Sequence, residues 1–367
     1  MQSRNVRIIS VPDIERNMRL IRSSVPDSAG VMAVVKADGY GHGAVETARA
    51  SIRGGATMLA VATADEGIEL RRAGIEVPIL ILGAATASDA YKAVDYGLTQ
   101  TVCSPDMVRI CESAAAQAGK KAEVHIAFDT GMGRIGIRTE NERDAVLNAI
   151  STCAHIVPVG AFTHFADADG DESGAEYTKS QFRRFLELTE VLPRDMIRHC
   201  CNSAAIHRFP EMGLDMVRAG ISLYGYPPVR AELPLHPCMQ WHAEISYIKE
   251  LPAGAFVSYG RTWKADGTVR VGTVTCGYGD GYHRAAGKKG YVLVCGKKAK
   301  ILGRVCMDQM MVDLSGIPEA AAGETAVLIG ESGEEEITAE DLAAWCGTIS
   351  YEILLSTGTR PERIYRY

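Results

Sequence analysis

The stretch Val31-Met-Ala-Val-Val-Lys36-Ala-Asp-Gly-Tyr40-Gly-His-Gly43 indicates how this 367-residue chain folds. Five apolar residues lead into a lysine and a glycine-rich polar run, which is typical of a buried strand that delivers an amine to a loop. Such a lysine is either a solvated strand end, the commoner case, or a functional amine. Gly39, Gly41 and Gly43 favour the functional amine, because without Cβ atoms they let the backbone approach a ligand, with the Tyr40 hydroxyl between them.

Apolar runs of this kind recur along the chain and are separated by helical patterns. They lie at residues 31–35, 58–62, 79–82, 100–103, 122–128, 156–163, 196–201 and 215–219. Helix starts between them are well marked, for example by the capping box Thr139-Glu-Asn-Glu142. Eight strands that alternate with helices predict an α/β fold whose N-terminal part is a (β/α)8 TIM-like barrel.

Polar residues able to do chemistry follow several of these predicted strands. They are Lys36, Asp129, Arg134, His164, Asn202, Ser203 and Arg218. Active sites of such barrels are built where the strands end and the loops begin. We therefore expect these side chains to form one site.

The pattern changes near Pro234. From Trp241 short alternating segments separated by turns replace the helical spacing, with one late helix near residues 339–345. We expect the barrel to span residues 1–234 and a mainly-β domain to span residues 235–367. The opening strand, at about residues 6–10, could pack with the β domain.

Composition excludes several classes of function. A net charge of −6 without a long basic run argues against nucleic acid as a partner. No apolar stretch approaches the roughly 20 residues of a membrane helix, and the N-terminus lacks a signal peptide, so we expect a cytoplasmic protein with no membrane partner. The ten cysteines include no Cys-x-x-Cys pair, so we expect reduced thiols and no metal site.

Two short motifs suggest other ligands. Residues 131–136 satisfy G-x-G-x-x-G, but the next helix begins about three residues later, at Thr139, and no acidic residue follows at the distance that a ribose contact requires. Residues 167–172 resemble a calcium loop, but the glycine comes too early and the terminal glutamate is missing. We interpret both as ordinary loops.

A strand-end lysine that can form a Schiff base, and a loop after Arg218 whose backbone amides could hold a phosphate, together suggest pyridoxal phosphate (PLP). The motifs Ala33-Val-Val-Lys36-Ala-Asp-Gly-Tyr-Gly-His-Gly43, Phe128-Asp-Thr-Gly-Met-Gly-Arg-Ile-Gly136, Thr163-His-Phe-Ala166, Asn202-Ser-Ala-Ala205, Arg218-Ala-Gly-Ile-Ser-Leu-Tyr-Gly225, Val257-Ser-Tyr-Gly260, Gly277-Tyr-Gly-Asp-Gly-Tyr282, Arg304-Val-Cys-Met-Asp-Gln-Met310 and Tyr351-Glu352 follow one another in order. With these motifs nearly the whole chain, β domain included, resembles the alanine racemase family.

The resemblance implies a PLP-dependent isomerase that interconverts L-alanine and D-alanine by a two-base mechanism and supplies D-alanine for peptidoglycan. Lys36 would hold the cofactor and act as the base on one face of the substrate. Tyr259 of the partner subunit in a homodimer would act on the other face. Both groups need a lowered pKa, which His164 and Arg218 would supply beside the tyrosine. Arg218 would also face the pyridine nitrogen of PLP and keep it unprotonated.

The other roles are carried over from the family by position. Further cofactor contacts would come from Tyr40, Ser203, Gly220, Ile221 and Tyr351. Arg134 and the backbone at Met307 would bind the substrate carboxylate. Tyr278, Arg284 and Arg304 would line the entrance.

The chain departs from the family pattern at two places. Many members have a lysine, often carbamylated, where this chain has Ala127, so Arg134 would lack its usual anionic partner. The opening Trp-Ala-Glu-Ile of the family is also absent.

Three alternatives remain beside alanine racemase. A serine or broad-specificity racemase would differ only in the dimensions of the substrate pocket. A PLP-binding homeostasis protein would share the barrel but lack the β domain. A decarboxylase of related architecture would be expected to carry other β-domain motifs.

Overall fold

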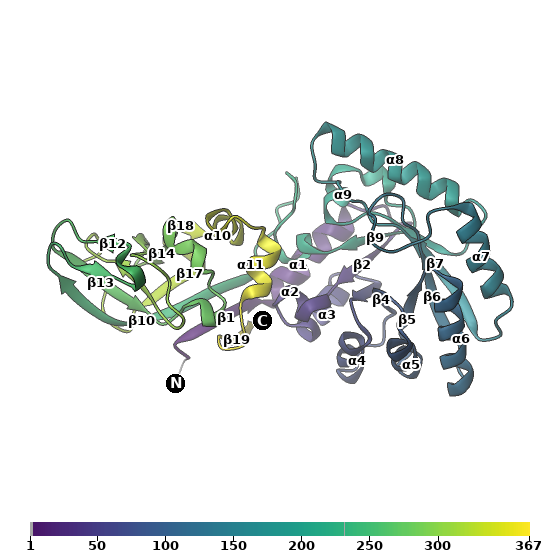
Figure 1. The fold of residues 1–367 in the computed structure, drawn as a ribbon, viewed down its shortest axis with the longest axis horizontal. Helices are drawn as coiled ribbons and strands as arrows, with labels where there is room; N and C mark the ends of the chain where they lie inside the picture. The colour runs from purple at the N-terminus through teal and green to yellow at the C-terminus, as the bar shows by residue number, and fades with distance from the viewer. Residues whose placement is uncertain (1–2, 231) are drawn as a thin grey trace. The chain divides into compact units, whose positions relative to one another are not determined.

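The computed structural model describes residues 3–230 and 232–367, which fold into two compact units (Figure 1). One unit is Ile14–His236, and the other joins the N-terminal residues up to Asp13 with Pro237–Tyr367. Within the described residues, each helix is too short or too polar to cross a membrane.

The first unit is a closed barrel of eight parallel strands, counted over the described residues, and this confirms the predicted (β/α)8 fold. The strands are β2 (Gly30–Val34), β3 (Met58–Val61), β4 (Ile79–Ala84), β5 (Thr99–Val102), β6 (Ala122–Ala127), β7 (Ile156–Phe162), β8 (Ile197–His199) and β9 (Met216–Ala219). The barrel closes because β2 pairs with β9 as well as with β3, with Gly30 opposite Met216. Each predicted apolar run corresponds to one of these strands.

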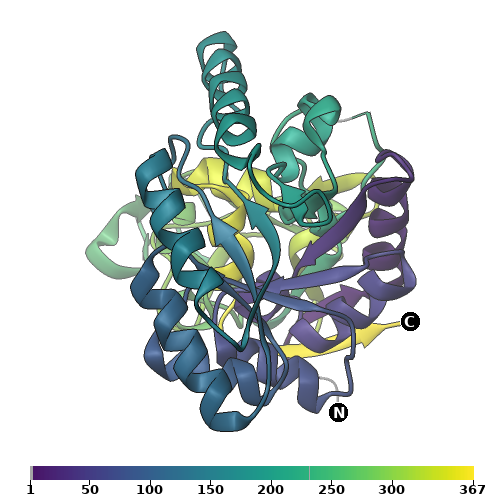
Figure 2. The ribbon, with the colours of Figure 1, turned by 90° about the vertical axis from the view of Figure 1, so that its right-hand side faces the viewer.

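Helices alternate with the strands and pack outside them (Figure 2). They are α1 (Val11–Ser23), α3 (Ala44–Arg53), α4 (Ala64–Arg72), α5 (Ala87–Asp95), α6 (Pro105–Ala118), α7 (Glu140–Ser151), α8 (Glu172–Thr189) and α9 (Ser203–Arg208). Side-chain caps fix several of their starts. Thr63 with Glu66 and Thr139 with Glu142 form capping boxes on α4 and α7.

The second unit is built on a twisted sheet. Its strands are β1 (Asn5–Ser10), β10 (Met239–Leu251), β13 (Val269–Val274), β14 (Tyr291–Val294), β15 (Lys297–Lys300), β16 (Met310–Asp313), β17 (Thr325–Ser332), β18 (Glu335–Ile337) and β19 (Glu362–Arg366), and β11 (Phe256–Val257) pairs separately with β12 (Trp263–Lys264). β1 lies between β10 and β19. The indole nitrogen of the buried Trp241 donates to Asn5 Oδ1 at 2.7 Å, which ties β1 to β10.

The prediction of a single late helix in the β domain was wrong. α10 (Ala339–Cys346) is followed by α11 (Ser350–Ser356), which carries Tyr351. Thr338 caps α10 with a capping box, whereas the N-cap of α11 is Ile349, which provides no side-chain bond. The sequence therefore contains no capping signal for the second helix.

Candidate active site

Lys36 follows β2 directly and begins the short segment α2 (Lys36–Tyr40), which is a left-handed turn. Ala37, Asp38 and Gly39 have φ of 52°, 53° and 59°, and Tyr40 has φ of 51°. A left-handed conformation costs a residue other than glycine about 1–2 kcal/mol. The surrounding structure must therefore hold this run of residues in place.

Hydrogen bonds to side chains hold the turn at Ala37 and Asp38. Ala37 N donates to Glu66 Oε1 at 2.7 Å, and Ala44 N donates to Asp38 Oδ1 at 3.1 Å. Gly39 serves the turn as well, since a Cβ there would lie 2.9 Å from Thr47 Oγ1. Gly39, one of the glycines that we expected to admit a ligand, therefore also meets a steric requirement of the turn itself.

The Lys36 amine is half-buried and makes no hydrogen bond or ion pair with the described part of the chain. Burial lowers the pKa of this amine, and the positive charges of Arg134 and Arg218 lower it further, while the Glu66 carboxylate raises it. A lysine with a lowered pKa and no structural partner is suited to act as a nucleophile or a base.

Arg218, at the end of β9, is buried beneath this site. Its guanidinium donates to Thr163 O at 2.9 Å and to Cys200 O at 3.0 Å. It also donates to the Nδ1 atoms of His199, at 2.8 Å, and His164, at 3.3 Å. Burial lowers the pKa of Arg218 to about 10, so the guanidinium remains charged at neutral pH.

Because a guanidinium can only donate, it fixes the tautomers of the histidines around it. His164 and His199 accept at Nδ1 and therefore carry their protons on Nε2. His199 Nε2 lies 2.9 Å from His125 Nδ1, so His125 in turn carries its proton on Nε2. Burial, with the charge of Arg218, lowers the pKa of His164 and of His125 to about 3 and keeps the pKa of His199 well below its ordinary value.

A small cradle lies around Gly220, at the end of β9. The Ser203 hydroxyl accepts hydrogen bonds from the backbone nitrogens of Gly220, at 3.0 Å, and Ser222, at 3.3 Å. A Cβ on Gly220 would lie 3.4 Å from Tyr40 Oη and 3.5 Å from Ser203 Oγ. The hydroxyls of Ser203 and Tyr40 therefore flank a residue without a side chain, an arrangement that fits the phosphate of PLP, and Lys36 and Tyr40 are the two ends of one turn.

Arg134 lies in the loop after β6, and the part of the chain that the structure describes offers it no anionic partner. Ala127 is buried, and Arg134 makes no hydrogen bond or ion pair within the described residues. Asp129 instead accepts from the backbone nitrogens of Gly131, at 3.1 Å, and Gly133, at 2.9 Å. No side chain described here replaces the missing lysine.

The two sequence motifs that suggested other ligands have roles in loop conformation and helix capping instead. A Cβ on Gly136 would lie 2.3 Å from Asp129 N, so this glycine allows the loop to close on β6. In the acidic loop, Asp171 caps α8, and Arg208 donates to the carbonyl oxygens of Ala168, at 3.3 Å, and Asp171, at 3.2 Å.

The other predicted site residues lie in the second unit. Tyr259 follows Ser258, whose φ is 65°, and the tyrosine residue is 70% exposed. An open cavity of about 600 Å³ beside it is lined by Ser258, Tyr259, Cys306, Met307, Asp308 and Gln309. The structure therefore brings Tyr259 and Met307 together.

The three predicted entrance residues are not among those that line this cavity, although two of them contact residues next to it or in its wall. A Cβ on Gly260 would lie 3.1 Å from the Arg304 guanidinium. Tyr278 N donates a hydrogen bond to Cys306 O at 3.0 Å. Arg284 is exposed in a separate 3-10 turn (Arg284–Lys288), with no polar partner among the residues described. Tyr351 lies on α11.

Comparison with known proteins identifies the family. The family models described as "Alanine racemase, N-terminal domain" and "Alanine racemase, C-terminal domain" match residues 9–228 and 238–365. The chain belongs to the alanine racemase family. It is 42% identical to an alanine racemase of Desulforamulus reducens over 97% of both chains. Members of the alanine racemase family are PLP-dependent isomerases, and this chain is accordingly an amino-acid racemase.

Solved structures agree with this assignment. The crystal structure of alanine racemase from E. faecalis, 34% identical, superposes with a TM-score of 0.94 over 99% of this chain and 98% of that one. A histidine racemase from Leuconostoc mesenteroides, 28% identical, has a TM-score of 0.90 over 100% of this chain and 99% of that chain. The alanine racemase fold therefore also occurs in a racemase named for another amino acid.

Sequence reasoning missed three residues of this site, Glu66, His125 and His199. His199 ends the strand that precedes Asn202 and Ser203, and this position was the available signal. His125 contacts His199, which is 74 residues away in sequence, and Glu66 contacts Ala37, which is 29 residues away. No local sequence pattern indicates contacts of this kind.

Proposed function

We propose that this chain is a PLP-dependent alanine racemase that interconverts L-alanine and D-alanine and provides D-alanine for peptidoglycan. The observation that carries the proposal is the Lys36 amine, a half-buried strand-end lysine with a lowered pKa and no hydrogen-bond or ion-pair partner among the residues that the structure describes. In a chain of this family, such an amine is suited to hold PLP and to move the α-proton of the substrate.

The residues of the barrel would hold the cofactor. Ser203, Tyr40 and the backbone at Gly220 and Ile221 would bind its phosphate, together with Tyr351, and Lys36 would bind its aldehyde carbon. When bound, PLP supplies an electron sink for the charge left by removal of the α-proton. Arg218 would face the pyridine nitrogen as a donor, so this nitrogen would receive a hydrogen bond but no proton.

Two bases on opposite faces of the substrate would complete the reaction. Lys36 would take or return the proton on one face, and Tyr259 of a partner subunit would do so on the other. His164 would assist the tyrosine, because its Nε2 proton can be donated to a phenolate. Arg134 and the backbone at Met307 would bind the substrate carboxylate, and Tyr278, Arg284 and Arg304 would line the entrance.

The test is to follow the loss of optical activity of L-alanine, L-serine and L-histidine in wild type and Tyr259→Phe. We expect alanine to react about tenfold faster than the others or more. Tyr259→Phe should lower the alanine rate about a hundredfold or more. Equal rates on the three substrates would overturn the alanine assignment, and a fully active Tyr259→Phe would overturn the role of the tyrosine.

A broad-specificity racemase is the second candidate. The similarity to a histidine racemase supports it, because that protein has the same fold and a different named substrate. Comparable rates on alanine and serine in the same experiment would favour it.

A further inference from the structure

The carboxylate of Glu66 joins two loops at the carboxyl ends of neighbouring barrel strands. It accepts hydrogen bonds from Ala62 N, at 2.6 Å, and Thr63 N, at 3.4 Å, where β3 leads into α4. It also accepts from Ala37 N at 2.7 Å, and Ala37 is the residue directly after Lys36. One side chain thus caps a helix and binds the lysine turn.

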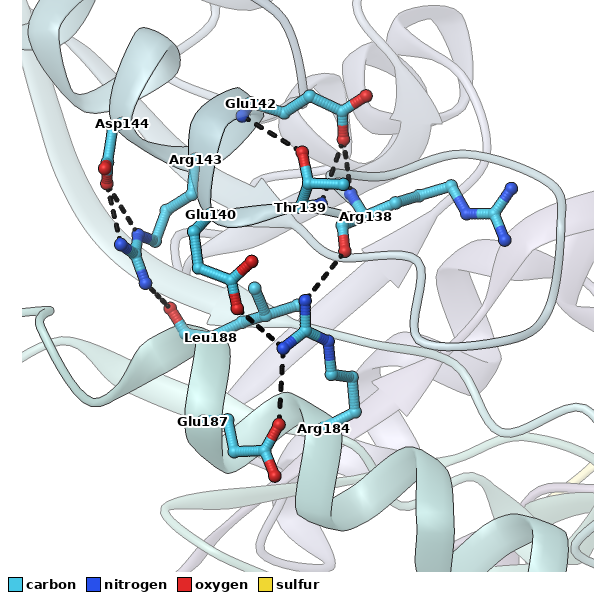
Figure 3. A network of polar contacts seen from close by, with 9 residues as sticks. All are labelled: Arg138, Thr139, Glu140, Glu142, Arg143, Asp144, Arg184, Glu187 and Leu188. Carbon is cyan, nitrogen blue, oxygen red and sulfur yellow. Dashed lines mark hydrogen bonds and ion pairs between the residues drawn. The ribbon is translucent and has the colours of Figure 1, made fainter.

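The same capping box occurs on α7 without the second role. Glu142 accepts from Arg138 N at 2.7 Å and from Thr139 N at 3.1 Å, while Thr139 Oγ1 accepts from Glu142 N (Figure 3). Within the described residues, the hydrogen bonds of this carboxylate come only from the start of α7. Glu142 is therefore a matched control for the capping role of Glu66.

The hydrogen bond from Ala37 N to Glu66 is made at the first residue of the left-handed run. Residues 37–40 form a left-handed run that contains three residues other than glycine, and such a run persists only when its surroundings hold it. Lys36 and Tyr40 are the two ends of this segment. Relaxation of the run would displace both the amine and the hydroxyl.

The negative charge of the Glu66 carboxylate also acts on the Lys36 amine. The charged and titratable groups around the Lys36 amine in the barrel are Arg134, Arg218, His164 and Glu66. Burial and the two arginines lower the pKa of Lys36, whereas Glu66 raises it. Loss of the carboxylate charge should therefore lower this pKa further.

We propose that Glu66 is a positioning residue for Lys36, whose carboxylate holds the left-handed run through Ala37 and places a negative charge beside the amine. The importance of this for catalysis rests on the proposed function of Lys36. The conformation and ionisation of the lysine do not depend on that function and can be measured separately.

The experiment compares Glu66→Ala and Glu66→Gln with Glu142→Ala and Glu142→Gln in the full chain from which any bound PLP has been removed. Hydrogen exchange of peptides that cover residues 31–44 reports on the turn, with residues 122–127 as an internal reference. The pH dependence of acylation of Lys36 by a trace amine reagent, read by mass spectrometry, reports on its pKa.

We expect Glu66→Ala to speed exchange at residues 37–40 about tenfold, because Ala37 N loses an ionised acceptor. Glu66→Gln keeps an acceptor, so its exchange should lie closer to wild type. Both Glu66 variants should lower the pKa of Lys36, and neither Glu142 variant should change the turn or the lysine. Addition of PLP should then give a weaker lysine-bound absorbance band in Glu66→Ala than in Glu142→Ala.

The proposal is overturned if exchange in Glu66→Ala matches wild type, or if Glu142→Ala alters residues 37–40 and Lys36 equally. An unchanged pKa of Lys36 in Glu66→Gln would overturn its electrostatic part. If wild type shows no lysine-bound PLP band, the proposed function fails, and the two measurements without PLP still decide the role of Glu66.

Discussion

At the scale of single residues, the proposed place of Arg218 opposite the pyridine nitrogen bears on which reaction PLP would support. A guanidinium there would leave that nitrogen unprotonated and PLP a weaker electron sink, which would favour return of a proton to Cα over competing reactions. We expect Arg218→Glu to increase transamination relative to racemisation. The measurement is the ratio of pyruvate formed to D-alanine formed, and an unchanged ratio would contradict this account.

Because the buried His125 has a lowered pKa, we expect the free energy of unfolding to fall in acid. The pKa of His125 is about 3 in the folded protein and near 6.5 in the unfolded chain, so the unfolded chain binds more protons between these values. This histidine should be neutral and without effect on the pH dependence above pH 6.5. Below that value the free energy of unfolding should fall by about 1.4 kcal/mol per pH unit on its account, down to pH 3.

The check is urea unfolding of wild type and His125→Asn between pH 6.5 and pH 4. Asparagine keeps an acceptor for His199 Nε2 but does not titrate, so the variant should show a shallower slope. Parallel slopes would show that His125 is not held neutral. Carboxylates that titrate in the same range contribute to both proteins and cancel in the comparison.

At the scale of elements, the loop after β6 shows why its glycines are present. A Cβ on Gly136 would lie 2.3 Å from Asp129 N at φ of 129°, whereas Gly133 has φ of 72° and open space around it. We expect Gly133→Ala to lower the free energy of unfolding by about 1–2 kcal/mol. Gly136→Ala should cost roughly 3 kcal/mol or more, since overlap adds to strain. Similar losses in denaturant titrations would contradict the distinction.

The elements were predictable from sequence where a local pattern encodes them. The barrel strands are apolar runs bounded by glycine or polar residues, and their ends place Lys36, His164 and Arg218 at one site. The left-handed turn was missed because Ala37 and Tyr40 carry no signal for positive φ, and neighbouring structure imposes it. α11 was missed for a related reason, since Ile349 offers no cap.

At the scale of the whole molecule, the proposed reaction requires Tyr259 of one chain to reach Lys36 of another. The two residues belong to different compact units, and Tyr259 is 70% exposed. We proposed that each site takes its lysine from one subunit and its tyrosine from another. Such sharing would give a homodimer with two sites, because the same contact made twice is the simplest closed arrangement.

Complementation between two inactive variants tests this arrangement. Lys36→Ala and Tyr259→Ala should each be inactive alone. After subunits are mixed under mild denaturation and refolded together, half of the dimers should be mixed, and each mixed dimer should contain one intact site. Activity should therefore recover to about a quarter of wild type when subunits exchange at random. Recovery should not occur if Tyr259 serves the lysine of its own chain, because every site would then keep one defect. A mixture of Lys36→Ala with wild type, which should retain about half of the wild-type activity per chain, controls for losses during exchange.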